Sequence, residues 1–283
     1  MPLSTIFRAE NVSTTLEQAN ELRDFCGLQV DELVAFRVER LIVHELLIHV
    51  TTGVAVPDGR DYEDLGKNFR EFAATILSRF IAPHREDLAR TFEQLQQNAR
   101  VFIERELINA LQTPKISAPA GHSRWRFAFG KRRGRPSPPA ETVVQRDQRI
   151  VSRWRQKSQN TDDRLQARCF AALHKVATAV ISQHGRLLGH SDLLRELAVT
   201  LLCNDFGSEA IGEAILPLVQ KAVACEGYRS LPREEKPIVM NVKGAPASGK
   251  STMRPLQKML AGKLNLPWVD FALISPDIWR KFL

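Results

Sequence analysis

Apolar residues recur at helical spacing through most of the chain before residue 233. One such stripe consists of Val30, Val34, Val38, Leu41 and Ile42, and another of Ile211, Ile215, Leu218 and Val219. Spacings of three and four residues place these side chains on one helix face, which packs into a core. Further helices are predicted near residues 13–26, 62–81, 84–112, 141–157, 162–184 and 191–203, with starts at Ser13 or Thr14, Thr161 and Ser191.

The pattern changes after residue 233. Two short apolar runs, Pro237–Val242 and Trp268–Ile274, have the length and composition of buried strands. Between them, a helical stripe is formed by Met253, Leu256, Met259, Leu260 and Leu264. Pro255 falls in the first turns of this helix, where a missing backbone donor is expected to bend the axis. The order of strand, helix and strand predicts the beginning of an α/β domain.

A phosphate-binding pattern, G-x-x-x-x-G-K-[ST], occupies the turn between the first strand-like run and the helix. The nine predicted binding residues are Gly244, Ala245, Pro246, Ala247, Ser248, Gly249, Lys250, Ser251 and Thr252. Glycines allow successive N–H groups to converge on phosphate oxygens, and the start of the helix adds a partial positive charge. Lys250 is predicted to contact the β and γ phosphates, and the Ser251 hydroxyl to hold Mg²⁺, with Thr252 a less favoured ligand. The sequence therefore predicts a site for ATP and Mg²⁺.

A second motif, Ser275-Pro276-Asp277-Ile278-Trp279-Arg280, follows the second strand-like run. Ligands of open α/β sheets bind at the carboxyl ends of strands. Asp277 could accept the proton of an attacking hydroxyl, and Arg280, one helical turn later, could neutralise a phosphate. A purely structural interpretation is also open, in which Ser275 caps a helix and Pro276 occupies its first turn. The two interpretations are compatible.

Residues from about Ile238 to Leu283 resemble the P-loop kinases of the polynucleotide kinase and zeta toxin group. The resemblance implies that Lys250 and Ser251 serve ATP and Mg²⁺, that Asp277 is the general base and that Arg280 binds substrate or phosphate. It further implies phosphorylation of a hydroxyl, on either a nucleic-acid 5′ end or a nucleotide-activated amino sugar.

These observations predict a mainly α N-terminal region followed by the start of an α/β P-loop NTPase domain with an incomplete parallel sheet. The expected organisation is a helical region at 1–115, a linker at 116–140, a second helical region at 141–232 and the start of a kinase domain at 233–283. A further carboxylate-bearing strand and a lid arginine do not follow Arg280, so we expect the kinase activity to belong to a longer parent protein. The alternative is a helical protein- or nucleic-acid-binding module with a non-catalytic NTPase remnant. In a related arrangement, the helices would cover the nucleotide site.

The net charge of +8 is concentrated between residues 113 and 140, where no acidic residue occurs. Its basic residues include Arg124, Arg126, Lys131, Arg132, Arg133 and Arg135, and the first of them alternate with Trp125, Phe127 and Phe129. Frequent Pro, Gly and Ser indicate a linker. The composition also permits contact with nucleic acid, including an AT-hook-like Arg-Gly-Arg-Pro core, or with an anionic membrane.

The remaining chemical signals are weaker. Cys26, Cys169, Cys203 and Cys225 lack the paired spacing of a zinc site, so reduced core cysteines are expected. His44 and His49 are five residues apart, which does not match the four-residue spacing of H-E-x-x-H. No signal peptide or membrane span is found. A cytoplasmic location, or secretion as a bacterial effector without a cleaved signal, is therefore expected.

Overall fold

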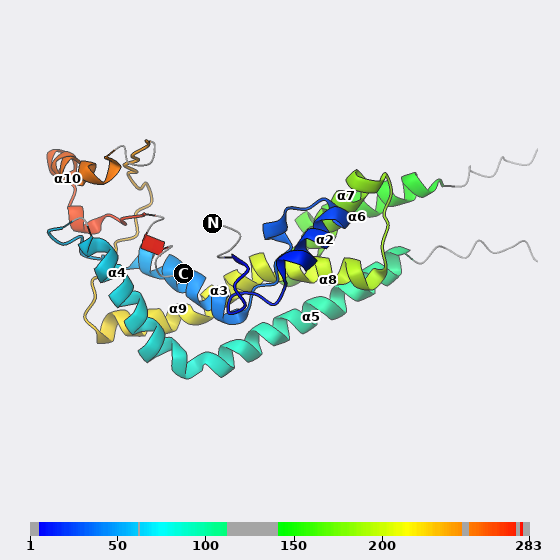
Figure 1. Cartoon of the computed structure of the whole chain (residues 1–283), viewed down its shortest axis with the longest axis horizontal. Coiled ribbons are helices and arrows are strands. Elements are labelled where there is room, and N and C mark those ends of the chain that lie inside the picture. The colour runs from blue at the N-terminus through cyan, green and yellow to red at the C-terminus, as the bar shows by residue number, and fades with distance from the viewer. Residues whose placement is uncertain (1–5, 62, 112–140, 245–248, 276–277, 280–283) are drawn as a thin grey trace, which may run out of the picture. The chain divides into compact units, whose positions relative to one another are not determined.

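The computed structural model describes residues 6–61, 63–111, 141–244, 249–275 and 278–279 (Figure 1). Of these residues, 72% are helical, which confirms the predicted helical character. The α-helices are α2 Leu16–Cys26, α3 Val38–Gly53, α4 Asp64–Thr75, α5 Arg85–Leu111, α6 Val143–Asn160, α7 Arg164–His184, α8 Ser191–Leu202, α9 Ser208–Cys225 and α10 Arg254–Lys263. Short 3-10 turns are η1 Val30–Glu32, η3 Ala82–His84, η5 Lys250–Met253 and η6 Trp268–Asp270, and the wider π turns are η2 Ile76–Ile81 and η4 Cys203–Gly207.

The predicted α/β domain is wrong for the part of the chain that the structure describes. These residues contain no β-strand, and their only ladder-type contacts are isolated bridges between Val12 and Phe36 and between Val54 and Ser230. Residues 237–242 are irregular, with Val239 80% exposed, and the second predicted strand begins instead as η6. A short apolar run becomes a strand only when neighbouring strands accept and donate its backbone hydrogen bonds. No such neighbours are found among the described residues.

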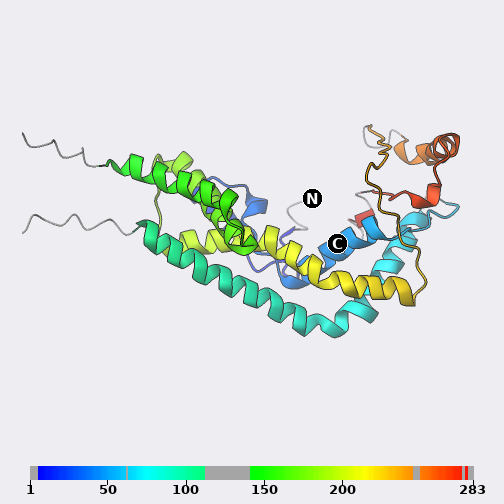
Figure 2. The ribbon, with the colours of Figure 1, turned by 180° about the vertical axis from the view of Figure 1, so that it is seen from behind.

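The first compact unit comprises Met1–Leu16, Val34–Gln96 and Cys203–Leu283. Its centre is the pair α3 and α9, which lie side by side in both views (Figure 1 and Figure 2). Leu46, Leu47 and Val50 of α3 are fully buried, as is Ile215 of α9. The predicted stripe on α9 therefore contributes to the core. The other predicted stripe, which starts at Val30, is divided between η1 and α3, because α3 begins only at Val38.

The second compact unit comprises Glu17–Leu33 and Gln97–Leu202. Helix α7 packs against both α6 and α8, and these contacts bury Leu173, Val180 and Leu194. Trp154 of α6 is 2% exposed, which makes it the largest side chain of this core. Burial of each large apolar side chain favours the folded state by roughly 1.5–3 kcal/mol before entropy is counted.

Local signals account for the ends of α6 and α7. Thr142 caps α6 by accepting from the Gln145 amide, and the Gln145 side chain accepts from the Thr142 amide in return. Asp163, two residues after the predicted start at Thr161, caps α7 by accepting from the Gln166 amide at 2.9 Å. Gly185 ends α7 in the left-handed conformation that glycine adopts without strain.

None of the four cysteines forms a disulfide; Cys26, Cys169 and Cys203 are buried, whereas Cys225 is exposed. The prediction of core cysteines therefore holds for the first three positions. None of the described helices combines the length and the apolar composition that crossing a bilayer requires.

Candidate functional site

The predicted phosphate-binding segment ends in a glycine turn that leads directly into a helix. Gly249 has a φ of 75° and a ψ of 20°, a left-handed conformation that strains any residue with a Cβ. The 3-10 helix η5 begins at the next residue and continues into α10. Thr252 stabilises the turn, because its amide and hydroxyl both donate to the Gly249 carbonyl, at 3.0 and 2.6 Å. This geometry accounts for the second glycine of the motif.

The structure describes only part of the predicted site. Ala245, Pro246, Ala247, Ser248, Asp277 and Arg280 lie outside the described residues. Lys250 and Ser251 form the first two positions of η5. Gly244 and Gly249 bound the loop, and the Thr252 hydroxyl donates to the Gly249 carbonyl. The described residues therefore define the exit of the loop and the helix that follows it.

Pro255 occupies a position of α10 at which proline is common. It lies in the first turn of this helix, where the backbone amide has no acceptor within the helix and proline is tolerated. The change from η5 to α10 occurs just before it. The α-helical part starts at Arg254, one residue before the proline, so Pro255 removes no hydrogen bond from the helix interior and the reason given for a bent axis does not apply.

The predicted apolar stripe of this helix faces solvent. Met253, Leu256, Met259, Leu260 and Leu264 are each 40–54% exposed, whereas Ala261 is fully buried. In a P-loop domain, the corresponding face would pack on a sheet. Because no sheet is present among the described residues, α10 is held mainly by a small set of polar and aromatic contacts.

Asp58, in the connection between α3 and α4, provides the centre of these contacts. Its carboxylate lies 2.7 Å from Lys258 Nζ of α10 and 3.3 Å from the indole Nε1 of Trp268. The Lys258 ammonium also lies 5.8 Å from the Trp268 ring centroid, within cation–π range. Asp58 therefore joins α10, η6 and the α3–α4 connection. We refer to Asp58, Lys258 and Trp268 as the Asp58 cluster.

Hydrogen bonds are defined for three described residues of the second predicted motif, Ser275, Ile278 and Trp279. The Ile278 amide donates to the Ser275 carbonyl at 3.1 Å, as the start of a helix requires. The Trp279 indole donates to the Thr51 hydroxyl of α3 at 3.1 Å. This contact places Trp279 beside α3, a role that the sequence pattern did not suggest.

A polar cluster around the buried side chains of Glu45 and Ser208 joins α3 to α9. The Ser208 hydroxyl donates to Glu45 at 2.5 Å, and His44 Nδ1 lies 3.2 Å from the same carboxylate. His49 contacts the Gly212 carbonyl at 2.9 Å, so His44 and His49 both serve helix packing. Burial raises the pKa of Glu45, but hydrogen bonds from His44 and Ser208 outweigh it, and the pKa lies below its ordinary value. Among the described residues, no group of His, Cys, Asp and Glu is arranged to hold a metal ion.

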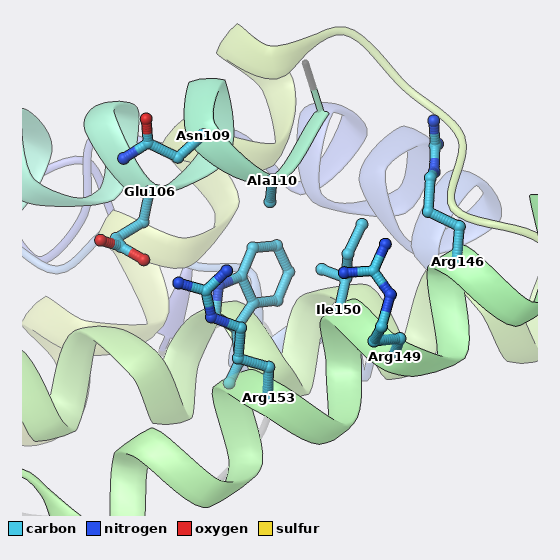
Figure 3. A pocket seen from close by; sticks show the side chains of 8 residues that line it. Glu106, Asn109, Ala110, Arg146, Arg149, Ile150 and Arg153 are labelled. Carbon is cyan, nitrogen blue, oxygen red and sulfur yellow. The ribbon is translucent and has the colours of Figure 1, made fainter. Parts of the chain in front are cut away.

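A basic pocket in the second unit was not predicted from the sequence. It has a volume of about 230 Å³ and lies between the end of α5 and the first turns of α6 (Figure 3). Arg146, Arg149 and Arg153 line it from α6, and Glu106 and Asn109 from α5. The arginine spacing of three and four residues was a readable signal for a basic helix face, but the partner residues on α5 are remote in sequence.

Comparisons of the chain with protein-family models, with curated proteins and with solved structures found no match.

Proposed function

We propose that the protein is an ATP-dependent phosphotransferase, which binds the phosphates of ATP through residues 244–252 and phosphorylates a hydroxyl group. The observation that supports this proposal is the left-handed turn at Gly249, followed at once by the helical residues 250–263. The first amides of a helix have no acceptor within it and therefore favour an anion at the preceding loop. The glycine turn thus suits the loop that the sequence motif predicts.

The proposal depends on the loop and its helix, and it does not require residues 237–242 to be a strand. Lys250 supplies a full positive charge for the β and γ phosphates. Mg²⁺ would be held by the Ser251 hydroxyl together with phosphate oxygens, where it would reduce their negative charge. Asp277 acts as general base toward the acceptor hydroxyl, and Arg280 neutralises phosphate charge.

The acceptor is a hydroxyl of a nucleotide-sugar or of a nucleic acid, both of which the resemblance to P-loop kinases implies. The cytoplasm, or a host cell reached without a cleaved signal peptide, would supply ATP and either acceptor. The Asp58 cluster supports the proposal by anchoring α10, the helix whose first turns follow the loop.

Substitution of Lys250 tests nucleotide binding. Lys250→Ala should weaken ATP binding by about 10- to 100-fold, since a hydrogen bond to a charged group contributes roughly 1.5–3 kcal/mol. Isothermal titration of the full chain with ATP and Mg²⁺ measures the change. Lys243→Ala, which removes an equal charge just outside the motif, is the matched control and should change affinity less than about twofold. Equal losses in the two variants would refute a specific role for Lys250.

Substitution of Asp277 tests catalysis. Asp277→Asn should leave ATP binding intact and reduce phosphate transfer by about 10²–10⁴-fold, as expected when a general base is lost. The assay follows labelled phosphate from ATP to an oligonucleotide with a free 5′ hydroxyl or to a nucleotide-activated amino sugar. Full transfer by the Asn variant would contradict the role of Asp277 while leaving the binding site untouched.

A helical binding module with a non-catalytic nucleotide site is the second candidate. The absence of strands from the described residues and the exposed apolar face of α10 favour it. This candidate predicts ATP binding that depends on Lys250 but no phosphate transfer to any acceptor. The titration and the transfer assay together therefore separate the two functions.

A further inference from the structure

Three arginines of α6 line the basic pocket of the second unit. Arg146, Arg149 and Arg153 are on one face of α6; in Figure 3 Arg149 and Arg153 extend toward α5, whereas Arg146 lies at the far side, away from Glu106 and Asn109. The Asn109 amide lines the opposite side and can donate as well as accept. Three guanidinium groups around one hollow repel one another unless negative charge is supplied.

Carboxylates of the protein supply only part of that charge. Arg146 lies 3.2 Å from Asp147, a carboxylate that is 1% exposed, and Arg149 makes two hydrogen bonds to Glu141 at 2.7 and 2.8 Å. Glu106, the acid that lines the pocket itself, is paired with Lys157 at 3.1 Å. Within the described part of the chain, Arg153 has neither an ion pair nor a hydrogen bond from its side chain.

The pocket's size and floor restrict the ligand. Its volume of about 230 Å³ is below the roughly 300–1,000 Å³ of pockets that enclose whole small molecules, so one anionic group fits better than a complete cofactor. Trp154 and Ile150 form an apolar floor and are 2% and 5% exposed. Such a surface excludes water and strengthens the attraction between a guanidinium group and a phosphate.

The pocket's place in the chain indicates a polyanion. Its residues come from the last turns of α5 and the first turns of α6, and these helix ends flank residues 112–140. That segment is basic and lacks acidic residues, and its aromatic residues alternate with arginines. Basic and aromatic side chains together are the composition that holds single-stranded nucleic acids. A strand attracted by this segment would meet the pocket at high local concentration.

We propose that the pocket formed by Asn109, Arg146, Arg149 and Arg153 binds a backbone phosphate of a single-stranded nucleic acid. The guanidinium groups of Arg149 and Arg153 make the principal contacts, and release of condensed counterions drives binding. This site is independent of the proposed phosphotransferase activity and requires no ATP.

Fluorescence anisotropy with a labelled DNA strand of about 20 nucleotides tests the proposal, since this length exceeds the ~4–16 nucleotides that one binding module covers. The double variant Arg149→Gln, Arg153→Gln should weaken binding about tenfold near 0.1 M salt. It should also reduce the slope of log affinity against log salt by about 1.4, at ~0.7 for each lost contact to a single strand. Arg155→Gln, which removes one positive charge at an exposed position of α6 outside the pocket, is compared with each single variant, Arg149→Gln and Arg153→Gln, and should alter neither quantity appreciably.

A structural role for the arginines gives a different result. Arginines near the end of α5 could serve only to neutralise its terminal carbonyls. In that case the double variant would melt at a lower temperature while the affinity and the salt slope stayed unchanged, and this outcome overturns the proposal. Thermal melting of each variant is therefore measured alongside the anisotropy.

Two further binding experiments define the ligand. In a chain with Lys131, Arg132, Arg133 and Arg135 changed to Gln, the remaining DNA affinity should still fall when the pocket arginines are replaced. If it does not, the basic segment alone binds DNA and the pocket proposal is wrong. Polyglutamate at equal charge concentration should compete poorly, because it lacks phosphates and bases. Equal competition by polyglutamate would show a general acidic ligand and would also overturn the proposal.

Discussion

Replacement of Gly212 by alanine should destabilise the first unit through one specific contact. A Cβ at this position of α9 would lie 2.5 Å from Oε2 and 3.1 Å from Cδ of Glu45. Glu45 is 9% exposed, and its other oxygen already accepts from Ser208 at 2.5 Å, so the carboxylate has little freedom to move away. Overpacking of this kind costs about 1–3 kcal/mol, and distortion of a hydrogen bond to a buried charge adds to it.

The higher helix propensity of alanine offsets about 1 kcal/mol of this penalty. We therefore expect Gly212→Ala to lower the free energy of unfolding by about 1–3 kcal/mol, measured by urea unfolding followed with circular dichroism. Gly53→Ala is the matched control, because Gly53 ends α3 and no atom lies within 4 Å of an added Cβ. Its unfolding midpoint should equal or exceed that of the wild type. Equal midpoints for the two variants would refute the packing argument.

Three further predictions concern three separate places in the first unit. Asp58→Ala removes the acceptor of Lys258 and Trp268 and should speed amide exchange in α10 by about tenfold, measured by mass spectrometry. Because Lys258 is 41% exposed, we assign most of the lost stabilisation to the hydrogen bond from the Trp268 indole. Glu45→Gln should make the free energy of unfolding depend less on pH in the acid range. The pKa of Glu45 in the folded protein lies below the unfolded value of 4.5, so the ionised carboxylate stabilises the fold above pH 4.5. This stabilisation is lost as the pH falls through the folded pKa. Gly249→Ala should weaken ATP binding about tenfold by titration, since a Cβ strains the left-handed turn by about 1–2 kcal/mol; unchanged affinity would contradict that turn's role.

The helices could be predicted because each carries its own signals. The Ile211 and Ile215 positions are buried as their spacing indicates, and Thr142 caps α6 through a local hydrogen bond to the next turn. Helix ends were less certain, since Asp163 rather than Thr161 caps α7. Capping depends on which of several neighbouring polar side chains reaches the free amides. The predicted helix end can therefore differ from the observed one by one or two residues.

The strands were predicted incorrectly because a strand depends on partners elsewhere in the chain. Val239 belongs to an apolar run that is typical of an inner strand, yet it is 80% exposed. The Gly249 turn, by contrast, is a local property of the motif, and the described part of the loop has it. The pocket around Arg153 could not be predicted from local signals. Asn109 lies on another helix, and the sequence gives no sign that these two residues meet.

The attachment of α10 also depends on contacts between residues that are remote in sequence, and it affects the proposed function. Ala261 is the only residue of α10 that is fully buried, so the attachment of this helix depends heavily on the Asp58 cluster. An element with few buried contacts opens with a small free energy. The apparent affinity for ATP equals the intrinsic affinity multiplied by the fraction of molecules in which the loop and helix are formed. Loss of Asp58 should therefore weaken ATP binding without touching the loop, and ATP should slow amide exchange in α10 by the reciprocal effect.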